Sequence, residues 1–147
     1  MRRVAISACL LGEKCRYDGE SNHAQALLEM LEGDELIPFC PEDSAFGSPR
    51  PTMDLIQTQC SIEAVCNESR ELRSEPIRIY ARNFFDQHGK IDLFIGKDRS
   101  PSCGVCSARV YDGEKNLLTS GAAGLMAQEA MDRKILAIDA EKFEGRE

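Results

Sequence analysis

The chain has 147 residues, 42% of them hydrophobic and 29% charged, a balance typical of one globular domain rather than of a disordered chain. With 18 Lys and Arg residues against 25 Asp and Glu, the formal net charge is −7. Because no basic run is present, the sequence argues against binding to duplex nucleic acid. No apolar run approaches the ~20 residues that cross a bilayer. Residues 4–11 resemble a core strand more than a signal peptide, so we expect a cytoplasmic protein without a membrane partner.

Segments with strand and helix patterns alternate along the chain. Short apolar runs bounded by Gly or Pro predict strands at residues 3–10, 35–39, 91–95 and 135–138. Apolar residues at helical spacing predict one helix capped by Ser21 or Asn22, one from Ser74 to Gly89, and one over about 121–133 capped by Thr119 or Ser120. Residues 55–66 and 108–119 predict hairpins, and the Pro- and Gly-rich stretch 41–51 predicts a loop.

This order of elements predicts an α/β fold. We expect a single three-layer Rossmann-like domain over residues 1–147, with a mostly parallel sheet and one or two hairpin additions. The charged tail 140–147 is expected to fray.

The cysteines are the most informative residues. There are 7 of them and only 2 His, and an odd number argues against a fully paired disulfide framework. Cys9 and Cys40 lie at the carboxyl ends of two predicted strands, and Cys103 lies in the loop that leaves a third. In a parallel sheet these ends border one crevice, so the three thiols are candidates for one site with an open coordination position. Soft thiolates without nearby His favour an iron–sulfur cluster or zinc.

Other interpretations of the cysteines remain open. The three thiols can instead be small buried core residues of a cluster-free binding domain. Cys103 and Cys106 form a C-x-x-C pair, which alternatively indicates a zinc-binding or thiol-redox module. Cys15 and Cys106 are possible extra ligands of the site, whereas Cys60 and Cys66 are expected to serve packing or to be exposed incidentally.

Polar residues near these thiols are further candidates. Glu42 can relay protons beside a metal, or be a solvated loop acid. Ser100 and Ser102 can donate hydrogen bonds to sulfide or substrate, or form a turn next to proline. The weaker candidates for substrate binding are Arg16, Asp18, Arg50 and the expected helix start at Gly121. An anionic substrate group can be held there through charge or through helix N–H groups. Alternatively, these residues merely serve ion pairing and packing.

Several motifs together resemble the thiouracil desulfidase family, which was long catalogued only as a domain of unknown function. They are Ile6-Ser-Ala-Cys-Leu-Leu-Gly12, Arg16-Tyr-Asp-Gly19, Cys40-Pro-Glu42, Pro49-Arg50, Ser100-Pro-Ser-Cys-Gly104 and Tyr111-Asp-Gly113. The resemblance covers about residues 4–139. The first motif and the Ser-Pro-Ser-Cys-Gly motif are specific in combination.

The resemblance implies a compact α/β domain with a [4Fe-4S] cluster on Cys9, Cys40 and Cys103. Its fourth iron is then open to the thione sulfur of a thiolated pyrimidine. Members of the family are hydrolytic desulfidases that convert such a base into the oxo-base and sulfide without net redox change. Glu42 and a serine, Ser100 or Ser102, are implied in proton transfer. Zinc is expected only where the cluster is lost or where the C-x-x-C interpretation holds.

Overall fold

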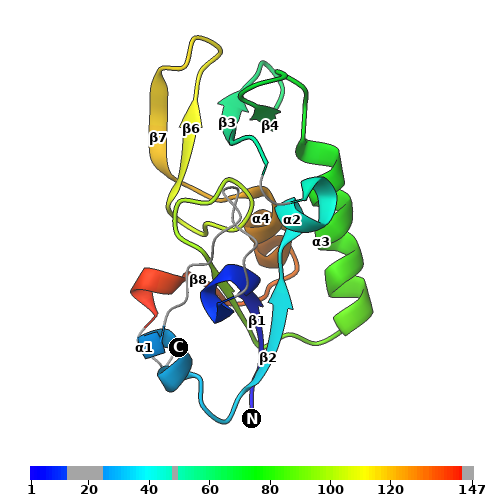
Figure 1. Cartoon of the computed structure of the whole chain (residues 1–147), viewed down its shortest axis with the longest axis vertical. Helices are drawn as coiled ribbons and strands as arrows, with labels where there is room; N and C mark the ends of the chain where they lie inside the picture. Colours follow the sequence, from blue (N-terminus) through cyan, green and yellow to red (C-terminus); the bar gives the residue numbers. More distant parts are fainter. Residues whose placement is uncertain (13–24, 48–49, 144–147) are drawn as a thin grey trace.

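The computed structural model describes residues 1–12, 25–47 and 50–143, and its core is a four-stranded sheet with the order β2-β1-β5-β8 (Figure 1). Every neighbouring pair in this sheet is parallel. The strands are β1 (Arg3–Ser7), β2 (Glu35–Phe39), β5 (Leu93–Gly96) and β8 (Ala137–Asp139). In this sheet β2 lies beside β1 on one side and β5 lies beside it on the other. The chain connections therefore run in opposite directions from β1, and such a change of direction creates a crevice at the carboxyl ends of the strands.

Helices cover both faces of this parallel sheet. Ala5 and Phe94 lie on the face that packs against α3 (Ser74–His88) and α4 (Leu125–Asp132). Val4 and Ile6 lie on the opposite face, in a second cluster. That cluster includes Leu27 of α1 (Gln25–Met30) and Leu31, which directly follows this helix. The alternation follows from the two-residue period of a strand, and it confirms the predicted layered α/β fold.

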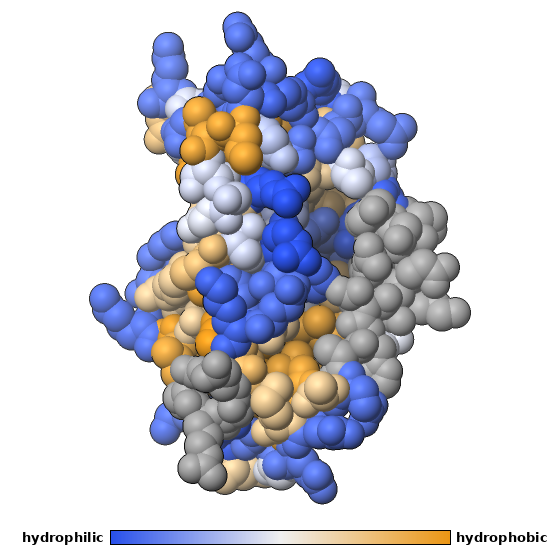
Figure 2. All heavy atoms as spheres, turned by 90° about the vertical axis from the view of Figure 1, so that its left-hand side faces the viewer, coloured by the Kyte–Doolittle hydropathy of each residue, from blue (hydrophilic) through white to orange (hydrophobic). Residues whose placement is uncertain are grey.

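A second four-stranded sheet, in the order β4-β3-β6-β7, holds both predicted hairpins. Its central strands β3 and β6 are parallel, whereas β3–β4 and β6–β7 are antiparallel. Leu117 and Leu118 on its edge strand are about half-exposed. Figure 2 shows a small hydrophobic patch on the mostly hydrophilic upper part of that side of the molecule. The strands are β3 (Met53–Gln57), β4 (Ile62–Cys66), β6 (Ala108–Tyr111) and β7 (Leu117–Ala122).

Several predicted boundaries are wrong, and each error has a local cause. The first strand ends at Ser7, and a 3-10 turn, η1 (Ala8–Leu11), follows it. The expected loop 41–51 begins with a helix, α2 (Pro41–Phe46), because proline at the first helical position is already set for the helical φ. Strand β7 continues to Ala122 and α4 begins after Gly124, so Thr119 and Ser120 are strand residues and not helix caps.

The beginning of the expected frayed tail packs against the fold. A 3-10 turn, η2 (Ala140–Lys142), follows β8, and Phe143 is buried in the cluster that contains Val4 and Ile6. Residues 144–147 lie outside the described part of the chain, as do Ser21 and Asn22, the expected caps of the first helix. Among the described helices, none combines the length and the apolar character needed to cross a membrane.

Candidate active site

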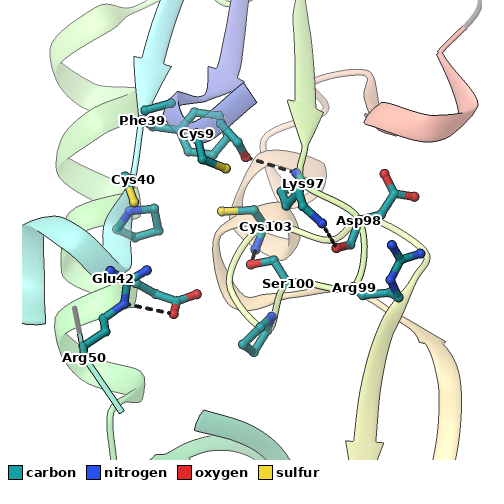
Figure 3. A pocket seen from close by; sticks show the side chains of 14 residues that line it. Cys9, Phe39, Cys40, Glu42, Arg50, Lys97, Asp98, Arg99, Ser100 and Cys103 are labelled. Carbon is teal, nitrogen blue, oxygen red and sulfur yellow. Dashed lines mark hydrogen bonds and ion pairs between the residues drawn. The ribbon is translucent and has the colours of Figure 1, made fainter. Parts of the chain in front are cut away.

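A cavity of ≈ 260 Å³ opens at the carboxyl ends of β1, β2 and β5. Cys9, Cys40 and Cys103 all line it, and Figure 3 shows their side chains pointing toward one another from three different elements. The topology of the sheet therefore brings together the three thiols that the sequence placed at strand ends.

Each thiol is held by a different local structure. Cys9 lies in η1, directly after β1, and is buried. Cys40 is the N-terminal cap residue of α2, between the end of β2 and Pro41. Cys103 lies in the loop that follows β5 and packs closely on that strand, since a Cβ atom at Gly96 would overlap the Cys103 carbonyl oxygen. A glycine at position 96 is therefore what lets the loop approach the strand.

The N-terminus of α4 is hydrogen-bonded to the loop that carries Cys103. Its first N–H groups donate to loop carbonyl oxygens, from Leu125 to Pro101 at 3.0 Å and from Met126 to Ser102 at 2.8 Å. These bonds satisfy N–H groups that a helix start leaves without partners inside the helix. The expected helix start at Gly121 is wrong, because α4 begins only at Leu125. Gly121 lies in β7, its N–H donates to Thr119 Oγ1 at 3.1 Å, and it does not line the cavity.

The far side of the same loop is tied to β8 by Asp139. The Asp139 carboxylate, which is 2% exposed, accepts bonds from Val105 N at 2.7 Å, Cys106 N at 2.9 Å and Ser107 Oγ at 2.8 Å. Three donors on one buried carboxylate fix both its orientation and that of the loop. The loop is thus held from α4 and from β8 at once.

Glu42 reaches the cavity from the first turn of α2. Its Oε2 accepts a hydrogen bond from Ser102 Oγ at 2.9 Å, and its Oε1 lies 3.5 Å from Arg50 Nε. The side chains of Arg50 and Glu42 are only 6% and 16% exposed, so this ion pair is screened weakly by solvent. Both of its oxygens are therefore oriented by neighbouring groups.

The two candidate serines occupy different positions. Ser100 lines the cavity, and its Oγ accepts bonds from Ser102 N at 3.2 Å and Cys103 N at 3.1 Å. Ser102 is fully buried and does not line the cavity; its hydroxyl reaches Glu42 instead. Ser100 can therefore meet a bound molecule directly, whereas Ser102 acts on the site through Glu42.

Burial sets the electrostatics of the site. It raises the pKa of the Cys103 thiol well above its ordinary value of 9.0, and the nearby Cys40 and Glu42 raise it further, while a hydrogen bond with Ser7 opposes the shift. The pKa of Asp98 is raised as well, mainly by burial. A positively charged group bound to the Cys103 sulfur would favour its thiolate form and so oppose this shift.

Four further polar or charged residues line the cavity that the sequence analysis did not name as candidates: Ser7, Lys97, Asp98 and Arg99. Lys97 N donates to Ser7 Oγ at 3.0 Å, which joins the ends of β5 and β1. Ser7 ends β1 and the other three directly follow β5, so their place at the carboxyl ends of buried parallel strands is the signal that points to them.

The remaining candidates fall outside this arrangement or outside the described residues. Cys106 and Cys60 are exposed and Cys66 is buried, and none of these cysteines lines the cavity. Cys15, Arg16 and Asp18 lie outside the described residues. In the described part of the chain, no three His, Cys, Asp or Glu side chains are grouped as ligands of a single metal ion.

A family model and a solved structure both relate this chain to thiouracil desulfurases. The model of the family described as 2-thiouracil desulfurase matches residues 4–142. The solved structure of a [4Fe-4S]-dependent thiouracil desulfidase, TudS, superposes with a TM-score of 0.76 at 26% identity, over 97% of this chain and 93% of that one. The protein YbbK of Bacillus subtilis (strain 168), described as uncharacterized, is 26% identical over 90% of this chain and 93% of its own length. The fold, the matched residues and the cavity motifs place this chain in the 2-thiouracil desulfurase family.

Proposed function

We propose that this protein removes sulfur from a thiolated pyrimidine by hydrolysis, with the help of a [4Fe-4S] cluster held by Cys9, Cys40 and Cys103. The observation that carries the proposal is the convergence of three thiols, from the segments that follow three strands, on one cavity that Glu42 also lines. In the balanced reaction, water and the thione C=S group give the C=O group of the oxo-base and hydrogen sulfide. No electrons are gained or lost overall, so no redox cosubstrate is needed.

The donors in the cavity suit such a cluster. Three soft thiols face one cavity from separate elements, and thiolates are the usual ligands of iron–sulfur clusters. Three protein ligands leave one iron of a four-iron cluster without a cysteine. When bound, the cluster supplies a Lewis-acidic iron for the thione sulfur. The remaining walls of the cavity combine apolar residues such as Phe39 with polar and charged ones, among them Glu42 and Lys97.

The side chains around Glu42 support its role as the proton-transfer group. Glu42 takes the proton of the attacking water at a carboxylate oxygen and later returns a proton to the departing sulfur. Ser102 and Arg50 hold Oε2 and Oε1 of this carboxylate, which limits the directions in which it can face. Ser100, whose Oγ lines the cavity, is placed to contact the pyrimidine ring or the water.

The substrate we propose is a small thiolated pyrimidine of the thiouracil or thiouridine type. The TudS structure is described as a thiouracil desulfidase, and the cavity of ≈ 260 Å³ suits a small molecule rather than a duplex. A net charge of −7 disfavours binding to duplex nucleic acid. We expect the reaction to occur in the cytoplasm, where thiols stay reduced.

The test is to purify the protein without oxygen, measure iron and acid-labile sulfide, and assay sulfide release from 2- and 4-thiouracil compounds. We expect about four irons per chain, and loss of both iron and activity in Cys9→Ala, Cys40→Ala and Cys103→Ala. Cys60→Ala is the control, because Cys60 is exposed and outside the cavity.

Two results would contradict the proposal. One is stoichiometric zinc that persists after anaerobic reconstitution with iron and sulfide, and that is lost in Cys106→Ala. The other is a colourless protein, free of metal, whose stability does not change in Cys9→Ala. The first result would favour the zinc or thiol-redox interpretation of Cys103 and Cys106, and the second would favour a binding domain.

A further inference from the structure

Tyr80 of α3 contacts the backbone of one of the three cavity cysteines. The N–H group of Cys40 donates to the Tyr80 hydroxyl oxygen at 3.1 Å, across 40 residues of sequence. Tyr80 does not line the cavity itself. Its hydroxyl meets the site at the backbone of Cys40.

This hydrogen bond acts where the chain changes from strand to helix. Cys40 caps α2 with an extended backbone, φ −155° and ψ 90°, and no side chain caps the helix. The direction of the Cys40 side chain is fixed by these two dihedral angles and by χ1. A bond to the Cys40 N–H therefore restrains the orientation of the Cys40 thiol toward the cavity.

The Tyr80 ring is well placed to serve as a rigid support. It stacks on Phe84 with 6.1 Å between the ring centroids, and Phe84 packs edge-on against Phe39 at 5.7 Å. Phe39 is the residue that precedes Cys40. The hydroxyl and the strand end that it holds thus belong to one aromatic cluster, in which each ring limits the motion of the next.

The other end of α2 is also held from the start of α3. The guanidinium carbon of Arg73, the N-terminal cap residue of α3, lies 4.5 Å from the centroid of the Phe46 ring, in the last turn of α2. Such a cation–π contact contributes to the packing of the two helices. Helix α2, which carries Glu42, is therefore fixed at both ends by α3.

We infer that Tyr80 is a positioning residue: through its hydrogen bond to the Cys40 N–H, it holds the Cys40 thiol in the direction needed to bind the cluster. The inference rests on the proposed function to the extent that Cys40 is a cluster ligand. Its geometric part concerns the thiol alone, and it can be measured before any cluster is bound.

The first experiment compares Tyr80→Phe with wild type and with Tyr111→Phe, a partly exposed tyrosine of β6 that serves as a matched control. Each full-length protein, before reconstitution, is treated with iodoacetamide, and the alkylation rate of each cysteine is followed by peptide mass spectrometry. One neutral hydrogen bond corresponds to a factor of about two to ten in such a rate. We expect Cys40 to react faster by that factor in Tyr80→Phe, while Cys9 and Cys103 keep their wild-type rates.

Two outcomes would overturn the inference. An unchanged rate at Cys40 would show that the hydroxyl does not restrain it. An equal increase at Cys9, Cys40 and Cys103 would show a general loosening of the fold instead of a role at Cys40. Failure of wild-type protein to bind iron would count against the proposed function, yet these thiol rates would still report on Tyr80.

The loaded protein gives a spectroscopic readout. After anaerobic reconstitution, the visible circular dichroism of the cluster is expected to change in Tyr80→Phe and not in Tyr111→Phe, because the bands depend on how the cysteines are oriented around the cluster. Release of iron to a chelator is expected to be about two to ten times faster in Tyr80→Phe. Identical spectra and identical release rates in the two variants would count against the role of Tyr80.

A further measurement, amide hydrogen exchange, needs no substitution. Amide hydrogen exchange in wild-type protein reports whether the Cys40 N–H is bonded. We expect slow exchange at Cys40, comparable with neighbouring amides of β2. Exchange at the rate of an unprotected amide would overturn the inference even if the Tyr80→Phe variant failed to fold.

Discussion

The Ser102 hydroxyl donates a hydrogen bond of 2.9 Å to Glu42 Oε2, although the two residues lie 60 positions apart. Ser102 is fully buried, and the carbonyl oxygen of the same residue accepts the N–H of Met126 at 2.8 Å. One residue therefore connects the start of α4 with the carboxylate that we propose as the proton-transfer group. This arrangement makes Ser102 a support for Glu42 rather than a contact for the substrate.

Replacing Ser102 by Ala removes this support without adding bulk. Because hydrogen bonds to a charged acceptor contribute about 1.5–3 kcal/mol, we expect kcat for sulfide release to fall about 10- to 100-fold. KM is expected to change little, since Ser102 does not line the cavity. The measurement is steady-state sulfide release, with Ser120→Ala on the exposed strand β7 as control. A kcat within twofold of wild type would show that Glu42 needs no such support.

Gly96 offers a test of how closely the Cys103 loop must approach β5. In Gly96→Ala the new methyl group would overlap the Cys103 carbonyl oxygen, so the loop has to move. We expect a loss of about 1–3 kcal/mol or more in the free energy of unfolding, and a reduced iron content after reconstitution. Urea denaturation and iron analysis measure the two effects.

Gly113→Ala is the matched control for this change, since a Cβ atom there would meet no other atom within 4 Å. It is expected to leave stability and iron content close to wild type. If Gly96→Ala behaved in the same way, the close contact between strand and loop would not be needed to place Cys103.

The convergence of the cysteines could be predicted from sequence because it depends on few features. Apolar runs marked the strands, and Cys9 and Cys40 lie close to two strand ends. Parallel pairing then brings those ends to the same edge of the sheet. Only the local details were wrong, since Cys9 lies in a 3-10 turn beyond β1 instead of in the strand.

The supports of the site could not be predicted, because they depend on contacts between distant segments. Nothing around Ser102 indicates that α4 turns it toward Glu42, and nothing around Tyr80 indicates that its hydroxyl meets the N–H of Cys40. The Pro- and Gly-rich composition of 41–51 also concealed helix α2, which Pro41 starts and which packing against α3 stabilises.

Asp139 provides a test of how β8 holds the loop that carries Cys103. In Asp139→Asn one carboxylate oxygen becomes an NH2 group, which would face backbone N–H donors of Val105 or Cys106. We expect the free energy of unfolding to fall by about 2–3 kcal/mol, because buried donors lose their acceptor. The exposed Cys106 thiol should also react faster with iodoacetamide, since its backbone is released. An effect no larger than that of Asp132→Asn, on the exposed surface of α4, would mean that the loop is held by α4 alone.

The ion pair of Arg2 with Asp34 predicts how stability depends on pH. Asp34 accepts bonds from Arg2 N at 3.1 Å and from Arg2 Nη2 at 2.8 Å, and chiefly the side-chain bond lowers the pKa of Asp34 below its ordinary value of 3.8. A carboxyl whose folded pKa is lowered binds its proton more weakly than in the unfolded chain. Its stabilisation is therefore fully present above the unfolded value and is lost as the pH falls through the folded value.

Urea denaturation between about pH 6 and pH 2 measures this dependence, provided that wild type and Asp34→Asn are compared at each pH. We expect wild type to be the more stable protein at pH 6, and the difference to shrink steadily once the pH falls below about 4. Asp132→Asn serves as the control and should differ from wild type by a nearly constant amount. A difference between wild type and Asp34→Asn that stays constant over this range would show that the Asp34 carboxylate titrates alike in the folded and unfolded chains, so that Arg2 contributes nothing through its charge.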